Sequence, residues 1–175
     1  DKSRYIRAKA QTLEIQLEAE SSYLIVPTTY SPCEERAFLV SVISSSTFDF
    51  KPRRVPTKIA VAPVPVPVPV ASPARLEPEP EPFERTGAGR WTLPRLAGGC
   101  VQHPSWCENP QFELVPSTSG SFKIRLQQPQ ADGMPAIGFL VMRSKPGEPL
   151  VAPLQASELV GESQSKGVGE MPYEF

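Results

Sequence analysis

Apolar and polar residues alternate along much of the first fifty positions. In 12–18 every second residue is apolar, which places leucine and isoleucine on one face of a half-buried β-strand. A short apolar run at 23–26 ends at Pro27, and proline in that position is typical of an edge strand or a strand end. A further alternating run covers 37–43. This part of the chain therefore predicts three strands in meander order.

The pattern changes completely between residues 51 and 89. Valine and proline alternate through 61–70, and more prolines and glutamates follow. Proline fixes φ and removes a backbone donor, so an extended polyproline-like spacer is expected here. The alternating valines give such a rod an apolar side, which we expect to contact another protein. The valines concerned are Val64, Val66, Val68 and Val70.

Strand patterns resume in the second half of the chain. Alternating or continuous apolar runs cover 111–115, 121–127 and 136–142. The final segment, 146–175, is rich in Gly, Ser, Pro and Glu and is expected to be an irregular tail. The whole pattern predicts an all-β fold, an antiparallel β-sandwich interrupted by a long proline-rich extended linker.

Five stretches of this chain resemble a known domain. Residues 22–30 read SYLIVPTTY and lead into RAFLVSV at 36–42, while AGGC stands at 97–100, ENPQF at 108–112 and IGF at 137–139. Together they resemble the non-catalytic β-sandwich of calpains, called domain III. In that domain the GGC and NPQF stretch comes first and the YxIVPTTY stretch comes last. Here their order is reversed.

The reversed order allows two arrangements. Residues 1–50 resemble the C-terminal half of one sandwich, 51–89 form the linker, and 90–145 resemble the N-terminal half of either a second sandwich or the same, permuted one. We favour two adjacent sandwiches seen in part, although seven or so strands would also suit a single one. The resemblance implies structural roles for Tyr23, Pro27, Thr28, Tyr30, Phe38, Trp91, Gly98, Gly99, Cys100, Asn109, Pro110, Phe112, Gly138 and Phe139.

Composition narrows the partners and the compartment. The formal net charge is −1, from 18 basic and 19 acidic residues, so nothing draws the chain as a whole to nucleic acid or anionic lipid. The chain has only three cysteines, and an odd number cannot all pair within one chain. This count argues against a secreted disulfide scaffold and favours a reducing, cytoplasmic location. Prolines interrupt the uncharged stretches, so no transmembrane segment is expected. The chain begins at Asp1 and no signal-peptide pattern follows, so we expect it to be an internal piece of a longer intracellular protein.

His103 is the only histidine, so any catalytic or zinc site of the kinds considered would use it. Cys100, Cys107 and Asn109 lie near it in sequence, but the Gln-x-Gly-x-Cys-Trp context of the calpain nucleophile is missing. Structural zinc normally takes four ligands, and this stretch offers three. A packed loop is the favoured interpretation. We therefore expect no catalytic residue, no metal ligand and no cofactor in this segment.

The resemblance also implies calcium or phospholipid binding, because domain III is similar to calcium-dependent lipid-binding sandwiches. Calcium requires several converging oxygen ligands. The candidates are the pair Glu34 and Glu35 and the glutamates of the linker, and the second half carries no dense acidic run. Calcium is thus a weakly supported cofactor. Peripheral lipid binding stays open, and thin basic interleaving among the aromatic residues argues against nucleic acid.

These observations predict a non-catalytic structural or interaction module of a larger calpain-like protein. Its partners would be other proteins of a large cytoskeletal or ciliary (axonemal) assembly, reached through the linker and the sandwich surface. The alternative is a regulatory arm of an active intracellular calpain-type cysteine protease that responds to calcium or phospholipid.

Overall fold

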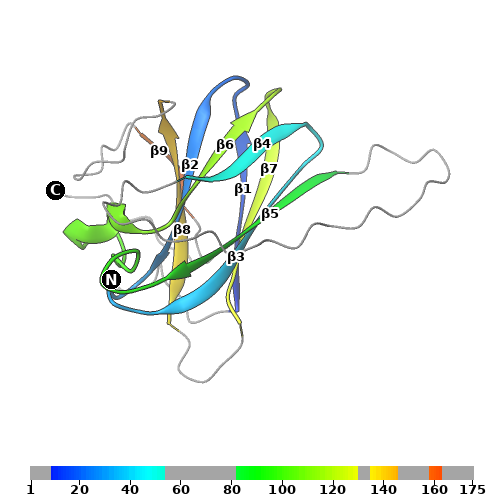
Figure 1. The fold of residues 1–175 in the computed structure, drawn as a ribbon. Helices are drawn as coiled ribbons and strands as arrows, with labels where there is room; N and C mark the ends of the chain where they lie inside the picture. Colours follow the sequence, from blue (N-terminus) through cyan, green and yellow to red (C-terminus); the bar gives the residue numbers. More distant parts are fainter. Residues whose placement is uncertain (1–8, 54–81, 130–134, 146–157, 163–175) are drawn as a thin grey trace, which may run out of the picture.

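Two antiparallel β-sheets packed face to face make up the fold (Figure 1). The computed structural model describes residues 9–53, 82–129, 135–145 and 158–162. The strand orders are β1-β7-β3-β5 and β4-β6-β2-β8-β9. The elements are β1 (Ala10–Leu17), β2 (Ser22–Thr29), β3 (Arg36–Ser44), β4 (Phe48–Arg53), β5 (Phe83–Trp91), the 3₁₀ helix η1 (Pro104–Glu108), β6 (Gln111–Pro116), β7 (Gly120–Gln127), β8 (Ile137–Ser144) and β9 (Leu159–Glu162). The prediction of an all-β fold is confirmed.

The strands that precede the proline-rich segment pair with strands that follow it. β1 pairs with β7, and β2 pairs with β8, along eight residues each, while β3 pairs with both β5 and β7. No two consecutive strands from β1 to β4 pair with each other, so the predicted meander is wrong. The described strands form one sandwich, against the favoured arrangement of two partial ones. Pairing between the groups satisfies strand edges that each group alone would expose.

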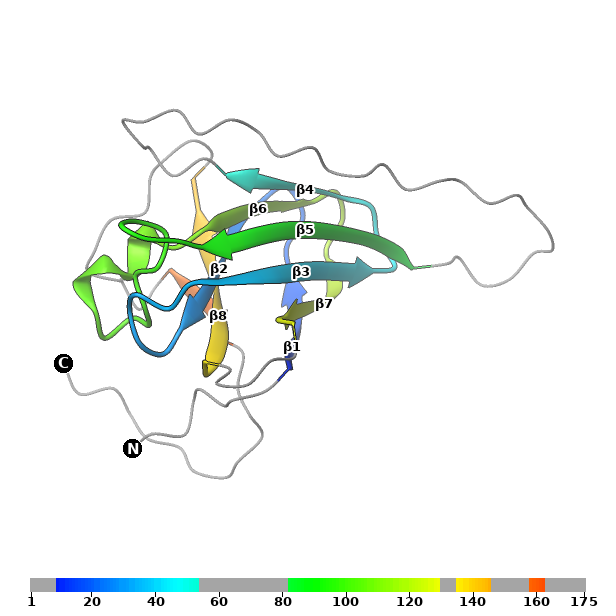
Figure 2. The same ribbon diagram turned by 60° about the horizontal axis from the view of Figure 1, so that its bottom comes forward.

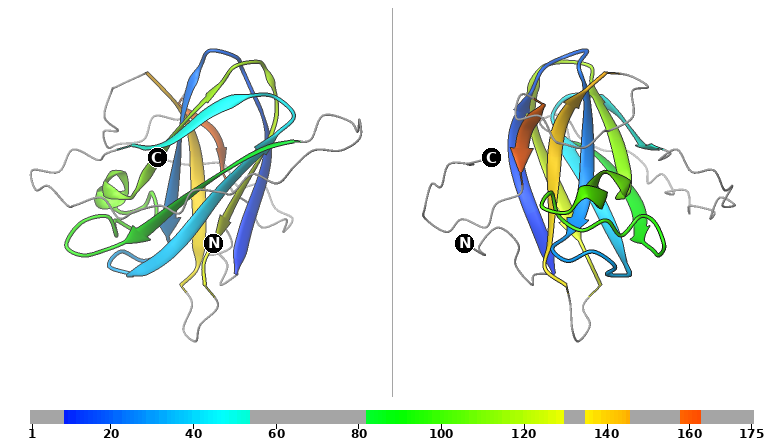
Figure 3. Two further views of the ribbon diagram at one scale, coloured as in Figure 1. Left: turned by 45° about the vertical axis from the view of Figure 1, so that its right-hand side comes forward. Right: turned by 90° about the vertical axis from the view of Figure 1, so that its left-hand side faces the viewer.

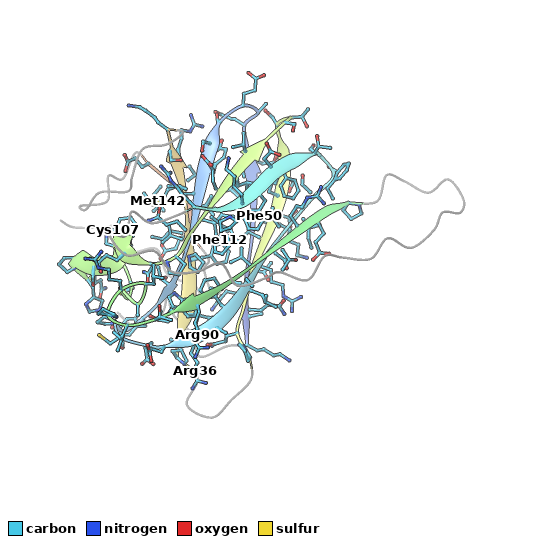
Figure 4. All side chains as sticks on the ribbon, in the orientation of Figure 1. Arg36, Phe50, Arg90, Cys107, Phe112 and Met142 are labelled. Carbon is cyan, nitrogen blue, oxygen red and sulfur yellow. The ribbon has the colours of Figure 1, made fainter. Side chains whose placement is uncertain are left out.

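Aromatic side chains fill the space between the sheets. Phe38 of β3 contacts Trp91 of β5 with ring centroids 4.4 Å apart, and it meets Phe112 of β6 edge-to-face at 6.1 Å. Phe50 of β4, which is partly buried, stacks on Phe112 with ring centroids 5.5 Å apart; both residues are labelled in Figure 4. Phe122 of β7 is fully buried. Residues from both sheets thus share one core, which holds the sheets together.

The outer face of the five-stranded sheet carries a second, smaller core. Leu24 and Val26 of β2 and Leu140 of β8 point away from the main core, and all are at most 1% exposed. Trp106 of η1 packs against this group. Figure 3 shows η1 and its flanking loops lying against β2 and β8. Because both faces of the sheet are covered at its central strand, every residue of β2 is buried.

The position of Pro27 differs from the sequence prediction. It lies inside β2, at the centre of the five-stranded sheet, and not at an edge or a strand end. β6 pairs only with Tyr23–Ile25, so Pro27 lies beyond the end of that ladder while it still faces Phe139 of β8. A proline can occupy a central strand at such a point, because β6 forms no ladder there that would need the N–H that proline lacks.

The strands extend further than predicted into the segments expected to be irregular. β4 continues to Arg53 and β5 begins at Phe83, so both strands lie partly inside the predicted 51–89 linker. β9 lies inside the predicted irregular tail and pairs with β8. The alternating valines and most of the linker lie outside the described residues, as do 146–157 and 163–175.

Candidate functional site

The buried amide of Asn109 organises a cluster of loops at one end of the sandwich. Its Nδ2 donates hydrogen bonds to the carbonyl oxygens of Gly99 (2.7 Å) and Trp106 (2.9 Å). Its Oδ1 accepts a hydrogen bond from the backbone N–H of Gly98 (3.0 Å). The side chain is fully buried. Three of its hydrogen-bonding positions are thus used on backbone groups, which fixes the loop before η1 against the start of β6.

The glycines of this cluster are required by close packing. A Cβ at Gly98 would overlap the carbonyl oxygen of Ser105, which is backbone and cannot move aside easily. Gly99 has a φ of +78°, a conformation that L side chains rarely adopt, and it lies against Pro32 and the ring of His103. Both positions therefore accept only glycine without a local rearrangement.

Hydrogen bonds join this cluster to the turn that follows β2. The Cys33 N–H donates to the Ala97 carbonyl (2.8 Å), and the Cys100 N–H donates to the Tyr30 carbonyl (3.4 Å). The Leu93 N–H donates to the carboxylate of Glu35 (2.8 Å). Residues expected to act structurally in the two halves of the chain thus meet here. We call this group of loops, 30–35 and 93–109, the loop junction.

Trp91 connects the loop junction to the main core. Its side chain is fully buried, and its Nε1 donates a hydrogen bond to the carbonyl oxygen of Pro27 (3.1 Å). This bond crosses from β5 in one sheet to β2 in the other. It also gives a partner to a carbonyl that lies past the end of the β2–β6 ladder.

The other predicted residues lie in or beside the core. The Thr28 hydroxyl donates to the Gly138 carbonyl (3.2 Å), and the Tyr23 hydroxyl accepts from the Glu18 N–H (3.0 Å). Phe139 is 1% exposed, whereas Tyr30 is 37% exposed. Pro110 lies between the Asn109 hub and β6. Most of these residues are thus buried, whereas the Tyr30 side chain is partly exposed.

The cysteines and histidine of the loop junction do not converge. Cys100 is buried, Cys107 directs its Sγ toward the Pro104 carbonyl at 3.8 Å, and the His103 ring lies against Gly99. Within 9–53, 82–129, 135–145 and 158–162, no group of three His, Cys, Asp or Glu side chains could hold a metal ion. Glu35, one candidate calcium ligand, is engaged with the backbone at Leu93.

Sequence reasoning missed one charged group, the carboxylate of Glu113 on β6. Lys51 of β4 forms an ion pair with it at 3.1 Å, and the Ser22 hydroxyl donates to it at 3.0 Å. Burial alone would raise the pKa of Glu113, but hydrogen bonds from Lys51 and Ser22, and the charges of Lys51 and Arg53, outweigh burial and lower it. The side chain is 11% exposed. No sequence signal marks this group, because its members come from three strands distant in sequence.

The four-stranded sheet presents an outer face that is largely accessible. Leu39 on β3 is 45% exposed, and the neighbouring strands add exposed charges. Ser41 and Thr86, opposite each other on β3 and β5, share a hydrogen bond of 3.1 Å. We call this surface the open face. Its exposed or partly exposed members include Thr12, Glu14, Leu39, Ile43, Glu84, Thr86, Ala88, Arg90, Lys123 and Arg125.

Comparison of the sequence with models of protein families and with curated proteins, and of the structure with solved structures, finds no match. Among the described residues, no helix has the length and hydrophobicity that crossing a lipid bilayer requires.

Proposed function

We propose that this chain is a non-catalytic structural and interaction module of a larger calpain-like protein. The observation that carries the proposal is the loop junction, where the residues of the resemblance use their polar groups on backbone. The amide of Asn109 forms hydrogen bonds with three backbone groups, and the indole N–H of Trp91 donates to the Pro27 carbonyl. Groups committed in this way support a sandwich and are not free to act on a substrate.

The module would serve as a scaffold part in a cytoskeletal or ciliary assembly. Its contacts would come from the open face of the four-stranded sheet and from the valines at 64, 66, 68 and 70. The open face suits such a role because Leu39 offers apolar area among exposed charges. A mixed surface of this kind is typical of the contacts between proteins that also fold on their own.

Detergent extraction of ciliated cells that express the tagged chain tests this function. We expect the chain to stay in the detergent-insoluble axonemal or cytoskeletal fraction. Leu39→Asp combined with Arg125→Glu, or serine at all four valines, should release it into the soluble fraction. Asp49→Arg, an exposed position on β4 of the other sheet, is the matched control and should change nothing. Full solubility of the unmodified chain would contradict the scaffold role.

Liposome co-sedimentation separates this function from a regulatory one. Vesicles that contain phosphatidylserine would be spun with the chain, with and without calcium. The scaffold role predicts no calcium-dependent pelleting. Pelleting that appears only with calcium would instead favour the regulatory arm of a calpain-type protease. The coding sequence upstream of Asp1 gives an independent check, since an intact Cys, His and Asn set there would favour the protease.

A further inference from the structure

β5 is one of the two edge strands of the four-stranded sheet. β5 pairs with β3 through all nine of its residues, from Phe83 to Trp91, in one uninterrupted register. No other described strand pairs with β5. Figure 2 shows β5 running beside β3 across the front of the molecule. An edge of this length presents a row of backbone N–H and C=O groups that can accept another strand.

The other three sheet edges are less suited to pairing. β9 is only four residues long. β4 contains Pro52, which lacks an N–H, and the neighbouring Lys51 carries a charge, and both features are common protections of sheet edges. β1 contains Glu14 and no basic residue, so a second β1 could offer it no opposite charge. β5 is therefore the edge best suited to pairing with an identical strand.

The sequence of β5 is self-complementary when two copies run antiparallel. Side chains directly opposite each other must lie on the same face, so only every second register is allowed. In the register centred on Gly87, Glu84 of each copy lies opposite Arg90 of the other. Both residues are exposed members of the open face. Two opposite-charge pairs therefore form across one two-fold axis.

Neighbouring registers lose this match. Centring on Thr86 places Glu84 opposite Ala88, and centring on Ala88 places it opposite Thr92. The Gly87 register also leaves room on the inward side, because Arg85 then faces Gly89, which has no side chain. Thr86 faces Ala88 in the middle, and both are small. Steric fit and charge thus favour the same register.

We propose that this chain forms a two-fold symmetric dimer with a second copy of itself through antiparallel β5–β5 pairing. The two four-stranded sheets become one continuous sheet of eight strands, in which Glu84 and Arg90 fix the register. Phe83 lies at the start of β5 and is 39% exposed. In the dimer it lies opposite Trp91 of the second copy. The proposal rests on β5 alone and does not depend on the calpain resemblance.

Sedimentation equilibrium of the full chain over a range of concentrations tests the dimer. The unmodified chain should show a concentration-dependent monomer–dimer equilibrium. Glu84→Arg alone, or Arg90→Glu alone, places like charges opposite each other twice and should raise the dimer Kd by about tenfold or more. The double variant restores opposite charges and should return the Kd close to its original value. Glu14→Arg, a charge reversal on β1, is the control and should leave the Kd unchanged.

Cysteine cross-linking provides a second, register-specific readout. In a Cys33→Ser background, Thr86→Cys chains mixed with Ala88→Cys chains should give a disulfide-linked dimer of one chain of each kind. A mixture of Thr86→Cys with Glu14→Cys chains should not. A chain that sediments as a monomer at every concentration would overturn the proposal. A dimer whose Kd is unchanged by both Glu84→Arg and Arg90→Glu would also overturn it.

Discussion

The two sheets of this sandwich differ in what their outer faces meet. In the five-stranded sheet, Leu24 points outward and is fully buried beneath η1 and Trp106. In the four-stranded sheet, Leu39 also points outward and is 45% exposed. The same residue type in equivalent positions thus has opposite surroundings. The central strands of one sheet are covered on both faces, and the other sheet has a surface that another molecule can contact.

Truncating these two leucines measures the difference between the sheets. Leu24→Ala should destabilise the fold by about 3 kcal/mol, because it removes buried apolar contacts and leaves a cavity. Leu39→Ala should change the free energy of unfolding by less than about 0.5 kcal/mol, since the side chain is half exposed. Urea unfolding followed by tryptophan fluorescence gives both values. Equal losses would mean that η1 does not cover the five-stranded sheet.

The loop junction holds that cover in place, and Asn109 is its hub. Asn109→Ala should cost about 2 kcal/mol, because it leaves buried backbone groups of Gly98, Gly99 and Trp106 without a partner. Asn109→Asp keeps an acceptor for Gly98 but loses both donors, so it should not restore stability. In the Asn109→Ala variant, hydrogen exchange should be faster in the loop junction than in β7. Uniform loss of protection across both sheets would argue against a local role.

Among the buried residues, the smallest effect is expected at Glu113 of β6, next to the edge strand β4 of the five-stranded sheet. Because its pKa is lowered in the folded state, its contribution to stability is present at neutral pH and is lost as pH falls through that lowered pKa. Glu113→Gln should therefore cost about 1 kcal/mol at pH 7 and less in acid. Glu14→Gln on the open face is the control, and its effect should stay small at every pH. A pH-independent cost at Glu113 would contradict the assigned ion pair with Lys51.

The hydrophobic pattern of the sequence located most strands. It failed for β5, whose place in the sheet depends on contacts with residues distant in sequence. Alternation located β1 and β3, and continuous apolar runs located β2 and β8. β5 was missed because its inward positions include Gly87 and Gly89, which break the expected hydrophobic alternation. Added Cβ atoms there would run into the rings of Phe112 and Phe38. At these two positions β5 therefore supplies only backbone to the core, and Phe112 and Phe38 supply the side chains.

Strand order and the charged site lay beyond what the sequence could predict. A meander is the simplest expectation for strands close in sequence, but β2 instead lies between β6 and β8. Motif resemblance did single out Asn109 and the glycines before it, although only as structural residues. Nothing linked Glu113 to Lys51 and Ser22, since pairing across β4, β6 and β2 brings them together.

Cleavage of the chain between its two strand groups tests most directly whether they form one sandwich. A site for a specific protease would be inserted between Val70 and Ala71, and the cut chain would be examined by size-exclusion chromatography and urea unfolding. One sandwich predicts that the two fragments elute together at the position of the intact chain and unfold in a single transition. Fragments that separate under native conditions, each keeping its own folded structure, would contradict this account.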